Sequence, residues 1–343
     1  MDLGQITDFR HACLKHLGKR QVFRQDKIRR QDIMSDKNAK DWGNYWQGRA
    51  ASEAGAALIG VGVETNQEIS AFWTEQLKAF PKTVSLLDLA CGAGSVVRRA
   101  AALGIEDITG VDISNEAIET LKSEFPDVKG VVASADFTGL PSGRFDIVAS
   151  QFGFEYADTL KAAGEAARLL KAGGQFLALA HSRNSAIEAE VSGLGGDAKA
   201  VIESGFITAA SAMFGADMSG ASDADFQKAA QAFASPQAEV LAIAKRAGGL
   251  AAHLYQGTQT LYQQRRRYNL GDIIGWLNGM EAEINAFIGR MDSMQRAALG
   301  DEDVKGILRV LEQGGLKPDP PKMFMSASTN DVLGVVISAA AKA

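Results

Sequence analysis

Two acidic residues frame a turn of small residues, and this arrangement is the part of the chain best suited to chemistry. The first acid, Asp88, ends an apolar run that continues into Leu89-Ala90-Cys91-Gly92-Ala93-Gly94. The second, Asp112, ends another apolar run 18 positions beyond Gly94. Small residues let the backbone approach a ligand closely, and the following helix directs its first amide groups at that ligand. Because a ribose-binding acid is expected at about this distance, the pattern predicts a nucleotide-binding turn.

Two kinds of nucleotide ligand compete for this turn. The dinucleotide fingerprint G-x-G-x-x-G needs a third glycine, which Gly92-Ala93-Gly94-Ser95-Val96-Val97 lacks. An acid beside the turn would repel a pyrophosphate, whereas it would attract a cationic amino-acid ligand. S-adenosylmethionine carries both an ammonium and a sulfonium group. The residues therefore favour S-adenosylmethionine, and a nicotinamide-dependent oxidoreductase is the competing interpretation.

The elements that must position these residues alternate between strands and helices. We expect buried strands over 84–89, 108–111, 130–133, 145–150 and 175–180, and helices over 64–80, 95–103, 115–125 and 159–170. Ser114 is the expected N-cap of the third of these helices. This alternation implies right-handed crossovers and a parallel sheet.

Residues beyond the fourth and fifth strands are candidates for the acceptor side, because ligands bind at the carboxyl ends of parallel strands. This set comprises Gln151, Phe152, Phe154, Glu155, Tyr156 and His181. His181 is the best general-base candidate, since the ordinary pKa of histidine lies near neutrality. Glu155 and Tyr156 are expected to orient a polar acceptor. A purely structural, helix-capping role for His181 remains the alternative.

After His181 the chain becomes alanine-rich and helical. We expect a helix to begin at Ser235-Pro236 and end at Gly248-Gly249, and a long helix over 272–298. That long helix is either a core-packing element or a lid or dimer helix. Strands return near the end of the chain, with an edge strand over 317–325 and an apolar strand over 332–339 joined as an antiparallel hairpin.

The amino-acid composition argues against several classes of binding partner. The chain has 343 residues, 46% of them hydrophobic, and a formal net charge of -5, which argues against a nucleic-acid substrate. Two cysteines suit a reducing, cytoplasmic setting, and they form no zinc-ligand spacing with the four histidines, so no metal is expected. No apolar run is long enough to predict a membrane span. Residues 1–33 are interpreted either as an upstream extension before Met34 or as an ordinary N-terminal helix.

The segment from about Thr83 to Ala180 resembles the catalytic core of class I S-adenosylmethionine-dependent methyltransferases. Their glycine-rich first motif is matched by Asp88, Ala90, Gly92 and Gly94, with Ala90 where glycine is more usual. Further matches lie at Phe145–Gln151, the fourth-strand motif, and at Leu169–Gly174, the turn before the fifth strand.

The resemblance implies a role for each matched residue. Asp112 would take both ribose hydroxyls, and Asp136 would accept the adenine amino group. Ile113 and Phe137 would sandwich the adenine ring, and Gln151 ends the fourth-strand motif. Tyr45-Trp46 matches a segment that closes over the cofactor in many small-molecule members, with an aromatic core anchor as the alternative. The Asn-Pro-Pro-Tyr signature of enzymes that methylate DNA bases or glutamine side chains is absent, since Gln151-Phe152-Gly153-Phe154 stands there.

The prediction is an α/β protein with a doubly wound, mostly parallel seven-stranded sheet, an antiparallel last strand and a helical insertion after the fifth strand. Its parts are an N-terminal extension with cap helices (1–80), a cofactor-binding core (81–181), a helical substrate lid (182–303) and a core-completing helix with hairpin (304–343). The implied activity is methyl transfer from S-adenosylmethionine to a small molecule, with a possible homodimer through the insertion. A protein or RNA methyltransferase, or a non-catalytic module that binds the cofactor, is the alternative.

Overall fold

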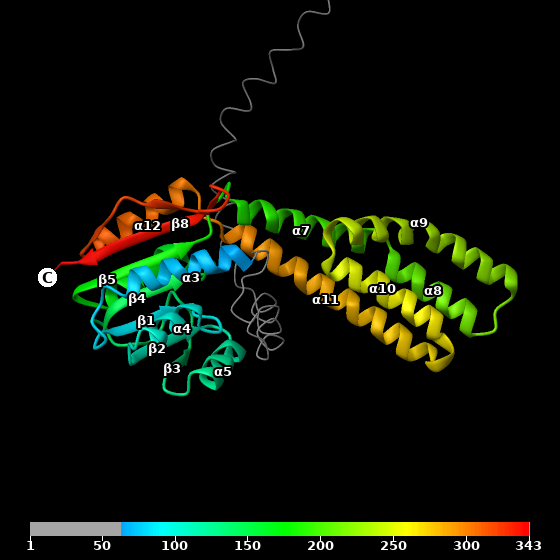
Figure 1. Ribbon diagram of the computed structural model, residues 1–343, viewed down its shortest axis with the longest axis horizontal. Coiled ribbons are helices and arrows are strands. Elements are labelled where there is room, and N and C mark those ends of the chain that lie inside the picture. The colour runs from blue at the N-terminus through cyan, green and yellow to red at the C-terminus, as the bar shows by residue number, and fades with distance from the viewer. Residues whose placement is uncertain (1–62, 343) are drawn as a thin grey trace, which may run out of the picture. The chain divides into compact units, whose positions relative to one another are not determined.

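The computed structural model describes residues 63–342 (Figure 1). Within this range the chain forms two compact units. One contains Glu64–Arg183 and the residues from Arg296 onward, and the other contains Asn184–Gln295. The hydrophobic core of each unit is built from its own residues. The predicted boundaries at 181 and 303 stay predictions, and each unit is described below by itself.

Five parallel strands form the centre of the first unit. They are β1 (Ser85–Leu89), β2 (Asp107–Asp112), β3 (Lys129–Val132), β4 (Phe145–Gln151) and β5 (Leu170–Ala180). Their order in the sheet is β3-β2-β1-β4-β5, so the chain reverses direction of winding at β1 and β4. Ligands of such sheets bind at the carboxyl ends of the strands near this reversal. The doubly wound α/β prediction is confirmed.

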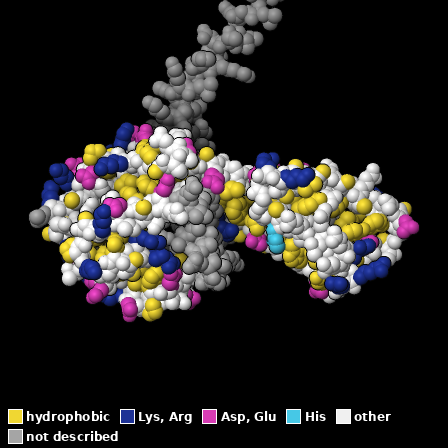
Figure 2. Space-filling view, in the orientation of Figure 1, with side chains coloured by type: hydrophobic (Ala, Val, Ile, Leu, Met, Phe, Trp, Pro, Cys, Tyr) yellow, Lys and Arg dark blue, Asp and Glu magenta, His cyan; other side chains and the backbone are white. Residues whose placement is uncertain are grey.

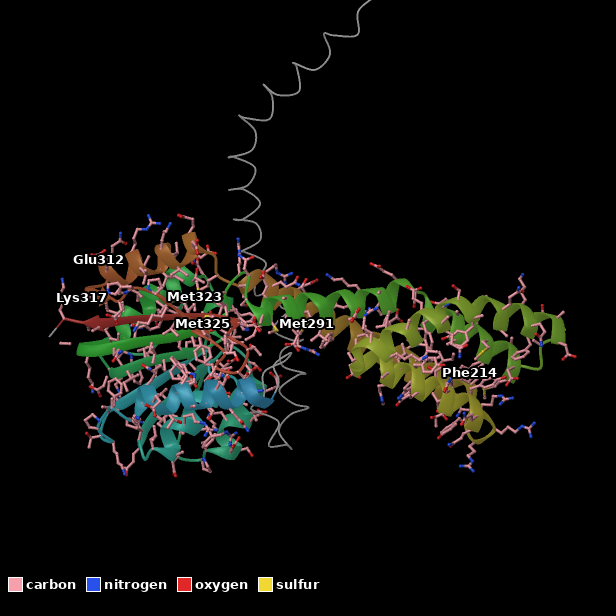
Figure 3. All side chains as sticks on the ribbon, turned by 45° about the horizontal axis from the view of Figure 1, so that its top comes forward. Phe214, Met291, Glu312, Lys317, Met323 and Met325 are labelled. Carbon is pink, nitrogen blue, oxygen red and sulfur yellow. The ribbon has the colours of Figure 1, made fainter. Side chains whose placement is uncertain are left out.

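The last strand is antiparallel, as predicted. β8 (Val332–Ala341) pairs with β5 and also carries two short edge strands, β6 (Leu316–Pro318) and β7 (Lys322–Met325). The sheet of the described residues thus has eight strands, because the expected edge strand over 317–325 is split. Pro318, Pro320 and Pro321 explain the split, since proline lacks the amide hydrogen that a continuous ladder requires. Met323 and Met325 lie on β7 (Figure 3).

Helices flank the sheet. The first unit contains α3 (Val63–Leu77), α4 (Ser95–Ala102), α5 (Asn115–Glu124), α6 (Thr159–Leu169) and α12 (Asp301–Gln313), with a 3-10 turn η2 (Phe154–Tyr156) after β4. Ser114 caps α5 as expected, because its hydroxyl accepts a hydrogen bond from the Ala117 amide at 3.1 Å. Helices α6 and α12 pack together and bury their apolar residues against β4, β5 and β8.

The second unit is helical. It comprises α7 (Ala186–Glu203), α8 (Phe206–Met218), α9 (Asp223–Ala247), α10 (Gly249–Gln264) and a 3-10 turn η3 (Arg265–Arg267), and most of α11 (Leu270–Ala297). The expected helix start at Ser235-Pro236 is wrong, because α9 begins thirteen positions earlier, where the Ser222 hydroxyl accepts a hydrogen bond from the Asp225 amide. Pro236 lies inside this helix. Packing of Phe233 and Val240 on either side of it outweighs the local cost of proline.

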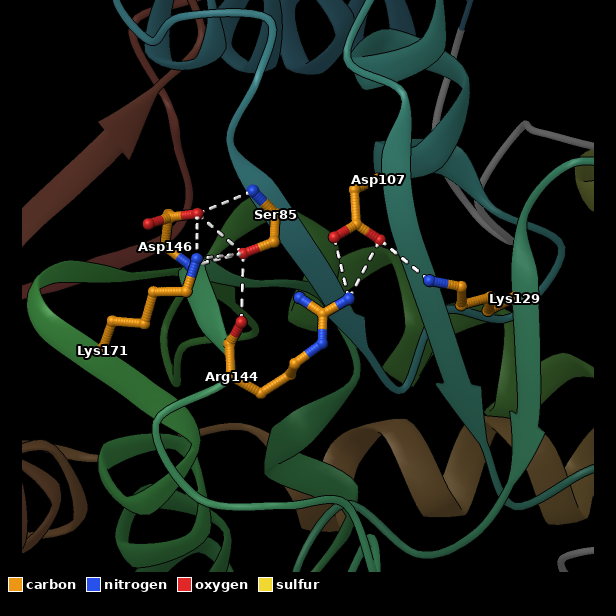
Figure 4. Close-up of polar contacts among 6 residues, drawn as sticks. All are labelled: Ser85, Asp107, Lys129, Arg144, Asp146 and Lys171. Carbon is orange, nitrogen blue, oxygen red and sulfur yellow. Dashed lines mark hydrogen bonds and ion pairs between the residues drawn. The ribbon is translucent and has the colours of Figure 1, made fainter.

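A charged network joins the beginnings of the five parallel strands (Figure 4). Lys171 donates to Asp146 at 2.8 Å, and the Asp146 carboxylate also accepts from the Ser85 backbone amide at 2.8 Å. Arg144 donates to Asp107 at 2.8 Å, and Lys129 reaches the same carboxylate at 3.1 Å. Each parallel strand supplies one residue of this network, either from the strand itself or from the position directly before it. Ion pairs and hydrogen bonds therefore stabilise the amino edge of the sheet.

Within residues 63–342, no helix is long and apolar enough to cross a membrane. In the same range no three histidine, cysteine or carboxylate side chains are grouped closely enough to hold a metal ion.

Candidate functional site

The turn after β1 adopts the left-handed backbone that a ligand cradle requires. Ala90, Gly92 and Gly94 have φ of 57°, 51° and 89°. An alanine in this region costs more than a glycine would, so Ala90 carries local backbone strain. Gly94 is needed for a second reason, since a Cβ there would lie 2.4 Å from the Leu121 Cδ1. Small residues therefore serve both the turn and its packing against α5.

Asp88 is a buried acid whose carboxylate lacks well-formed hydrogen bonds. It is 1% exposed, and neither carboxylate oxygen accepts a hydrogen bond of good geometry from the described chain. Burial raises the pKa of Asp88 to about 8, which the nearby Val97 amide opposes only in part and the neighbouring Asp112 carboxylate reinforces. A buried carboxyl with unmade hydrogen bonds is costly, so this position is suited to a cationic, hydrogen-bond-donating ligand.

Asp112 lies at the end of β2 and holds the turn. Its Oδ2 accepts a hydrogen bond from the Gly92 amide at 2.8 Å, and its Oδ1 accepts one from the Ser114 amide at 2.9 Å. Burial raises the pKa of Asp112 above its ordinary value, against the lowering effect of these two amides. Each carboxylate oxygen has a second lone pair, so Asp112 retains the capacity to accept two ligand hydroxyls.

The residues predicted to contact adenine follow β2 and β3. These two strands are neighbours, with Asp112 paired to Val132, so Ile113 and the 133–137 turn lie at one edge of the sheet. Phe137 is 77% exposed and Ile113 is also exposed, which is unusual for large apolar side chains. Asp136 is half-buried. Gln151 ends β4 and is half-buried too, whereas Tyr45 and Trp46 lie outside the described residues.

The three predicted catalytic residues come together beyond β4 and β5. His181 Nδ1 lies 2.8 Å from Glu155 Oε1, and the same oxygen accepts a hydrogen bond from the His181 backbone amide at 2.9 Å. The His181 and Glu155 residues are 5% and 1% exposed. A carboxylate at Nδ1 places the imidazole proton on that nitrogen, which leaves Nε2 with a lone pair.

Aromatic rings enclose this His–Glu pair. The Phe152 ring centroid lies 4.4 Å from the His181 ring, and the Tyr156 ring meets it edge-on at 5.8 Å. His181 Nε2 and Glu155 Oε2 are buried and have no hydrogen-bond partner within residues 63–342. The pair thus presents unsatisfied acceptor atoms in an apolar surrounding, and the Nε2 lone pair is the group with which a histidine base takes up a proton.

Two residues at this site lie within quoted motifs, but the sequence analysis assigned them no role. Ser150, the buried serine within β4, and Gly153, in the turn that follows, contact the β1 turn directly. For Ser150, the sequence shows a hydroxyl among the apolar residues of a buried strand. That pattern does not reveal which backbone groups the hydroxyl binds.

The residues of this edge fit S-adenosylmethionine. The orphaned Asp88 carboxyl suits its ammonium group, and the left-handed turn and exposed apolar side chains suit its nucleoside. The fold and these residues together define a Rossmann-like nucleotide-binding domain of the doubly wound class.

Part of this domain is similar to known methyltransferases. Residues 87–178 match the methyltransferase domain model. The chain is 31% identical over 105 residues to a ubiquinone/menaquinone biosynthesis C-methyltransferase, UbiE, from Campylobacter jejuni, and 36% identical over 109 residues to a demethylmenaquinone methyltransferase from Leptospira interrogans. Each alignment covers 29% of this chain, and 45% and 44% of the relatives, so the chain spans less than half of their length.

Solved structures give local matches. The YcgJ protein of Bacillus subtilis is 22% identical with a TM-score of 0.34, over 38% of this chain and 59% of that one. The geranyl diphosphate C-methyltransferase of Streptomyces coelicolor is 17% identical with a TM-score of 0.34, over 42% and 65%. The methyltransferase domain model thus covers part of the sheet-forming unit, from β1 to β5.

Proposed function

We propose that the chain transfers a methyl group from S-adenosylmethionine to a small-molecule acceptor, with His181 as general base. The observation that carries this proposal is the orphaned, buried Asp88 carboxyl beside a turn held by Asp112, at the same edge of the sheet as the His–Glu pair. The Asp88 carboxyl is suited to a cationic cofactor, and the His–Glu pair is suited to an acceptor that carries a proton.

On this proposal the chain's own residues hold the cofactor. Asp88 takes the ammonium group and Asp112 the ribose hydroxyls, while Ile113 and Phe137 contact the adenine ring and Asp136 its amino group. Gln151 borders the same edge. When bound, S-adenosylmethionine supplies a methyl group on an electrophilic sulfonium. The protein's contribution is to align the acceptor with that methyl group and to exclude water.

His181 then handles the acceptor's proton. Its Nε2 lone pair accepts the proton, and the positive charge that forms on the imidazole is stabilised by Glu155 at Nδ1. Phe152 and Tyr156 keep the surrounding dielectric low, which strengthens this charge interaction. A base is needed only for an acceptor that arrives protonated, so a hydroxyl-bearing or carbon acid is favoured.

A small acceptor is favoured over a macromolecule by two features. On the face shown in Figure 2, Lys and Arg side chains of the sheet-containing unit are interspersed with Asp and Glu side chains, whereas a nucleic-acid site gathers positive charge. The curated relatives are named for ubiquinone and menaquinone biosynthesis, which favours a small organic acceptor.

Binding of S-adenosylhomocysteine, measured by calorimetry, tests the cofactor half of the proposal. We expect Asp112→Ala to weaken affinity about 10- to 100-fold, because it removes charge-assisted hydrogen bonds. Asp127→Ala replaces an exposed acid and is the matched control. A methyl-donor turnover assay against a metabolite extract, read by mass spectrometry, tests the acceptor half. Preference for a nicotinamide nucleotide over S-adenosylhomocysteine would refute the proposal.

A further inference from the structure

The turn after β4 lies between the cofactor turn and the His–Glu pair. Ser150 is fully buried, and its hydroxyl donates a hydrogen bond to the Leu89 carbonyl at 2.6 Å. The same hydroxyl accepts a hydrogen bond from the Phe154 amide at 3.0 Å. Leu89 directly precedes Ala90 of the cofactor turn, and Phe154 directly precedes Glu155. One hydroxyl therefore joins the two halves of the site.

Gly153 brings the two turns into backbone contact. A Cβ at this position would lie 2.6 Å from the Ala90 carbonyl oxygen and 2.8 Å from the Ala90 Cβ. A Cβ so close to backbone cannot be relieved by a side-chain rotation. Any side chain here would push the strained Ala90 turn, so the glycine sets how closely the two turns approach.

The other side of the same turn holds the base. The Phe152 amide donates to the Leu179 carbonyl at 2.7 Å, and its left-handed φ of 48° accompanies a ring placed 4.4 Å from His181. Glu155 follows on η2 and accepts both His181 hydrogen bonds. The direction of the Glu155 side chain therefore depends on where the Ser150 hydroxyl holds the start of η2.

We propose that Ser150 is a positioning residue shared by the cofactor turn and the general base. By binding Leu89 and Phe154 at once, it fixes the β1 turn for cofactor binding and orients Glu155, and through Glu155 the His181 imidazole. This inference rests on the proposed function for its meaning in catalysis, but its effect on His181 is measurable in the cofactor-free protein.

Ser85 provides a matched control within the same pair of strands. It is also a buried serine of β1 facing β4, and its hydroxyl lies 2.7 Å from Asp146 Oδ2 and 3.1 Å from the Arg144 carbonyl oxygen. It bridges the strands at their beginnings, whereas Ser150 bridges them at their ends. Ser85→Ala and Ser150→Ala should each lower the melting temperature, since both remove buried hydrogen bonds.

The test compares wild type, Ser150→Ala and Ser85→Ala in two measurements. Calorimetry gives the affinity for S-adenosylhomocysteine. Proton NMR of the cofactor-free protein gives the His181 Nδ1–H signal, identified by its loss in His181→Gln. We expect Ser150→Ala to weaken affinity about tenfold and to shift or broaden the Nδ1–H signal. Ser85→Ala should keep affinity within about twofold and leave the signal in place.

Each outcome is decisive. Wild-type affinity together with an unchanged His181 signal in Ser150→Ala would overturn the positioning role, as would equal effects in Ser85→Ala. Failure of the wild type to bind would overturn the proposed function, while the NMR comparison still tests the link from Ser150 to His181. If Ser150→Ala does not fold, Gly153→Ala is expected to give the same two changes. Gly164→Ala, whose Cβ would meet its nearest neighbour at 3.7 Å, is the control for that substitution.

Discussion

Individual side chains at the carboxyl edge of the sheet combine burial with unmade hydrogen bonds. Asp88, Glu155 and His181 each keep at least one buried polar atom without a partner in the described chain. Such atoms are destabilising in a folded protein. In these three residues, which lie at one edge of the sheet, a ligand could supply the missing partners.

Replacing His181 should separate chemistry from cofactor binding. We expect His181→Ala to lower the turnover number about 10²- to 10⁴-fold, the range that general-base catalysis contributes, while affinity for S-adenosylhomocysteine stays within about twofold. Steady-state methyl transfer and calorimetry measure the two effects. His253→Ala, a histidine that packs on Trp276 in the helical unit, is the control. Unchanged turnover in His181→Ala would exclude the histidine as the base.

The affinity for S-adenosylhomocysteine should depend on Asp88 ionisation. Because burial raises the pKa of Asp88 to about 8, the free protein holds this acid neutral at pH 6 to 7. A cationic ammonium favours the carboxylate, so binding releases a proton below pH 8. Affinity should rise by up to about tenfold per pH unit from pH 6 and level off above pH 8. Calorimetry across this range checks it, and Asp88→Asn should flatten the dependence.

Motif and position supplied the candidate residues at this scale. His181, Glu155 and Tyr156 were predicted from strand ends alone, and the structure brings them into contact. Their roles stay predictions, as do those of the cofactor-binding set. Ser150 was not predicted, because a serine hydroxyl gains its function from two backbone groups far away in sequence. No local pattern encodes which groups these are.

Among the elements, the parallel strands are secured at their beginnings by the network of Figure 4. Burial opposes ionisation of Asp146, but hydrogen bonds from Lys171 and Ser85 outweigh it and lower its pKa to about 2. A lowered pKa in the folded state means that the stabilisation is present above the ordinary value near 4 and lost as pH falls toward 2.

Asp146→Asn should therefore destabilise the protein in a pH-dependent manner. We expect a loss of about 1 kcal/mol in the free energy of unfolding at pH 7, reduced because the pair is partly exposed. The loss should shrink as the pH is lowered to about 2.5. Urea unfolding at several pH values measures this, with Asp127→Asn, at an exposed acid, as control. An equal loss at pH 7 and pH 2.5 would contradict the electrostatic explanation.

Helix α9 contains a proline that destabilises it. Pro236 cannot donate the backbone hydrogen bond to the Ala232 carbonyl that a helix interior requires. Pro236→Ala should raise the free energy of unfolding of the helical unit by about 1 to 3 kcal/mol. Gly248→Ala should instead lower this free energy of unfolding, because Gly248 has a φ of 65° at the end of α9. A lower melting temperature in Pro236→Ala would show that the proline has a role in packing.

Sequence periodicity predicted these elements well where packing and local preference agree. The strands around Asp88, Asp112 and Gln151 and the Ser114 cap are examples, each found within a few residues of its expected place. Prediction failed at Pro236, because long-range packing determines the start of α9, and at residues 317–325, because prolines interrupt a strand that the hairpin pattern treats as continuous.

At the scale of the whole molecule, the sheet unit and the helical unit each bury a hydrophobic core within residues 63–342. The sheet unit buries residues such as Leu87, Phe176 and Ile307, and the helical unit buries Phe214 and Leu277 among others. Within the sheet unit, the Leu299 amide donates to the His181 carbonyl at 2.8 Å, and the Arg183 amide donates to the Leu299 carbonyl at 2.9 Å. The chain therefore leaves and re-enters this unit at neighbouring points.

The sheet unit should fold without the helical one. Replacing Asn184–Gln295 by a short Gly-Ser linker joins Arg183 to Arg296, three residues before Leu299, which the Arg183 amide already binds, so little loop entropy is added. We expect cooperative unfolding and an affinity for S-adenosylhomocysteine within about threefold of the full chain. Circular dichroism and calorimetry check these expectations. Loss of cofactor affinity in a folded deletion variant would show that the helical unit contributes to the cofactor site.

The charged network at the beginnings of the strands affects how the sequence of this protein can evolve. The charged network lies at one rim of the sheet, and the proposed cofactor and acceptor residues lie at the opposite rim. On the proposed function, substitutions at the acceptor side, apart from the bridging Ser150, therefore leave this network in place. Lineages that carry this architecture are free to explore new substrates while the scaffold remains intact.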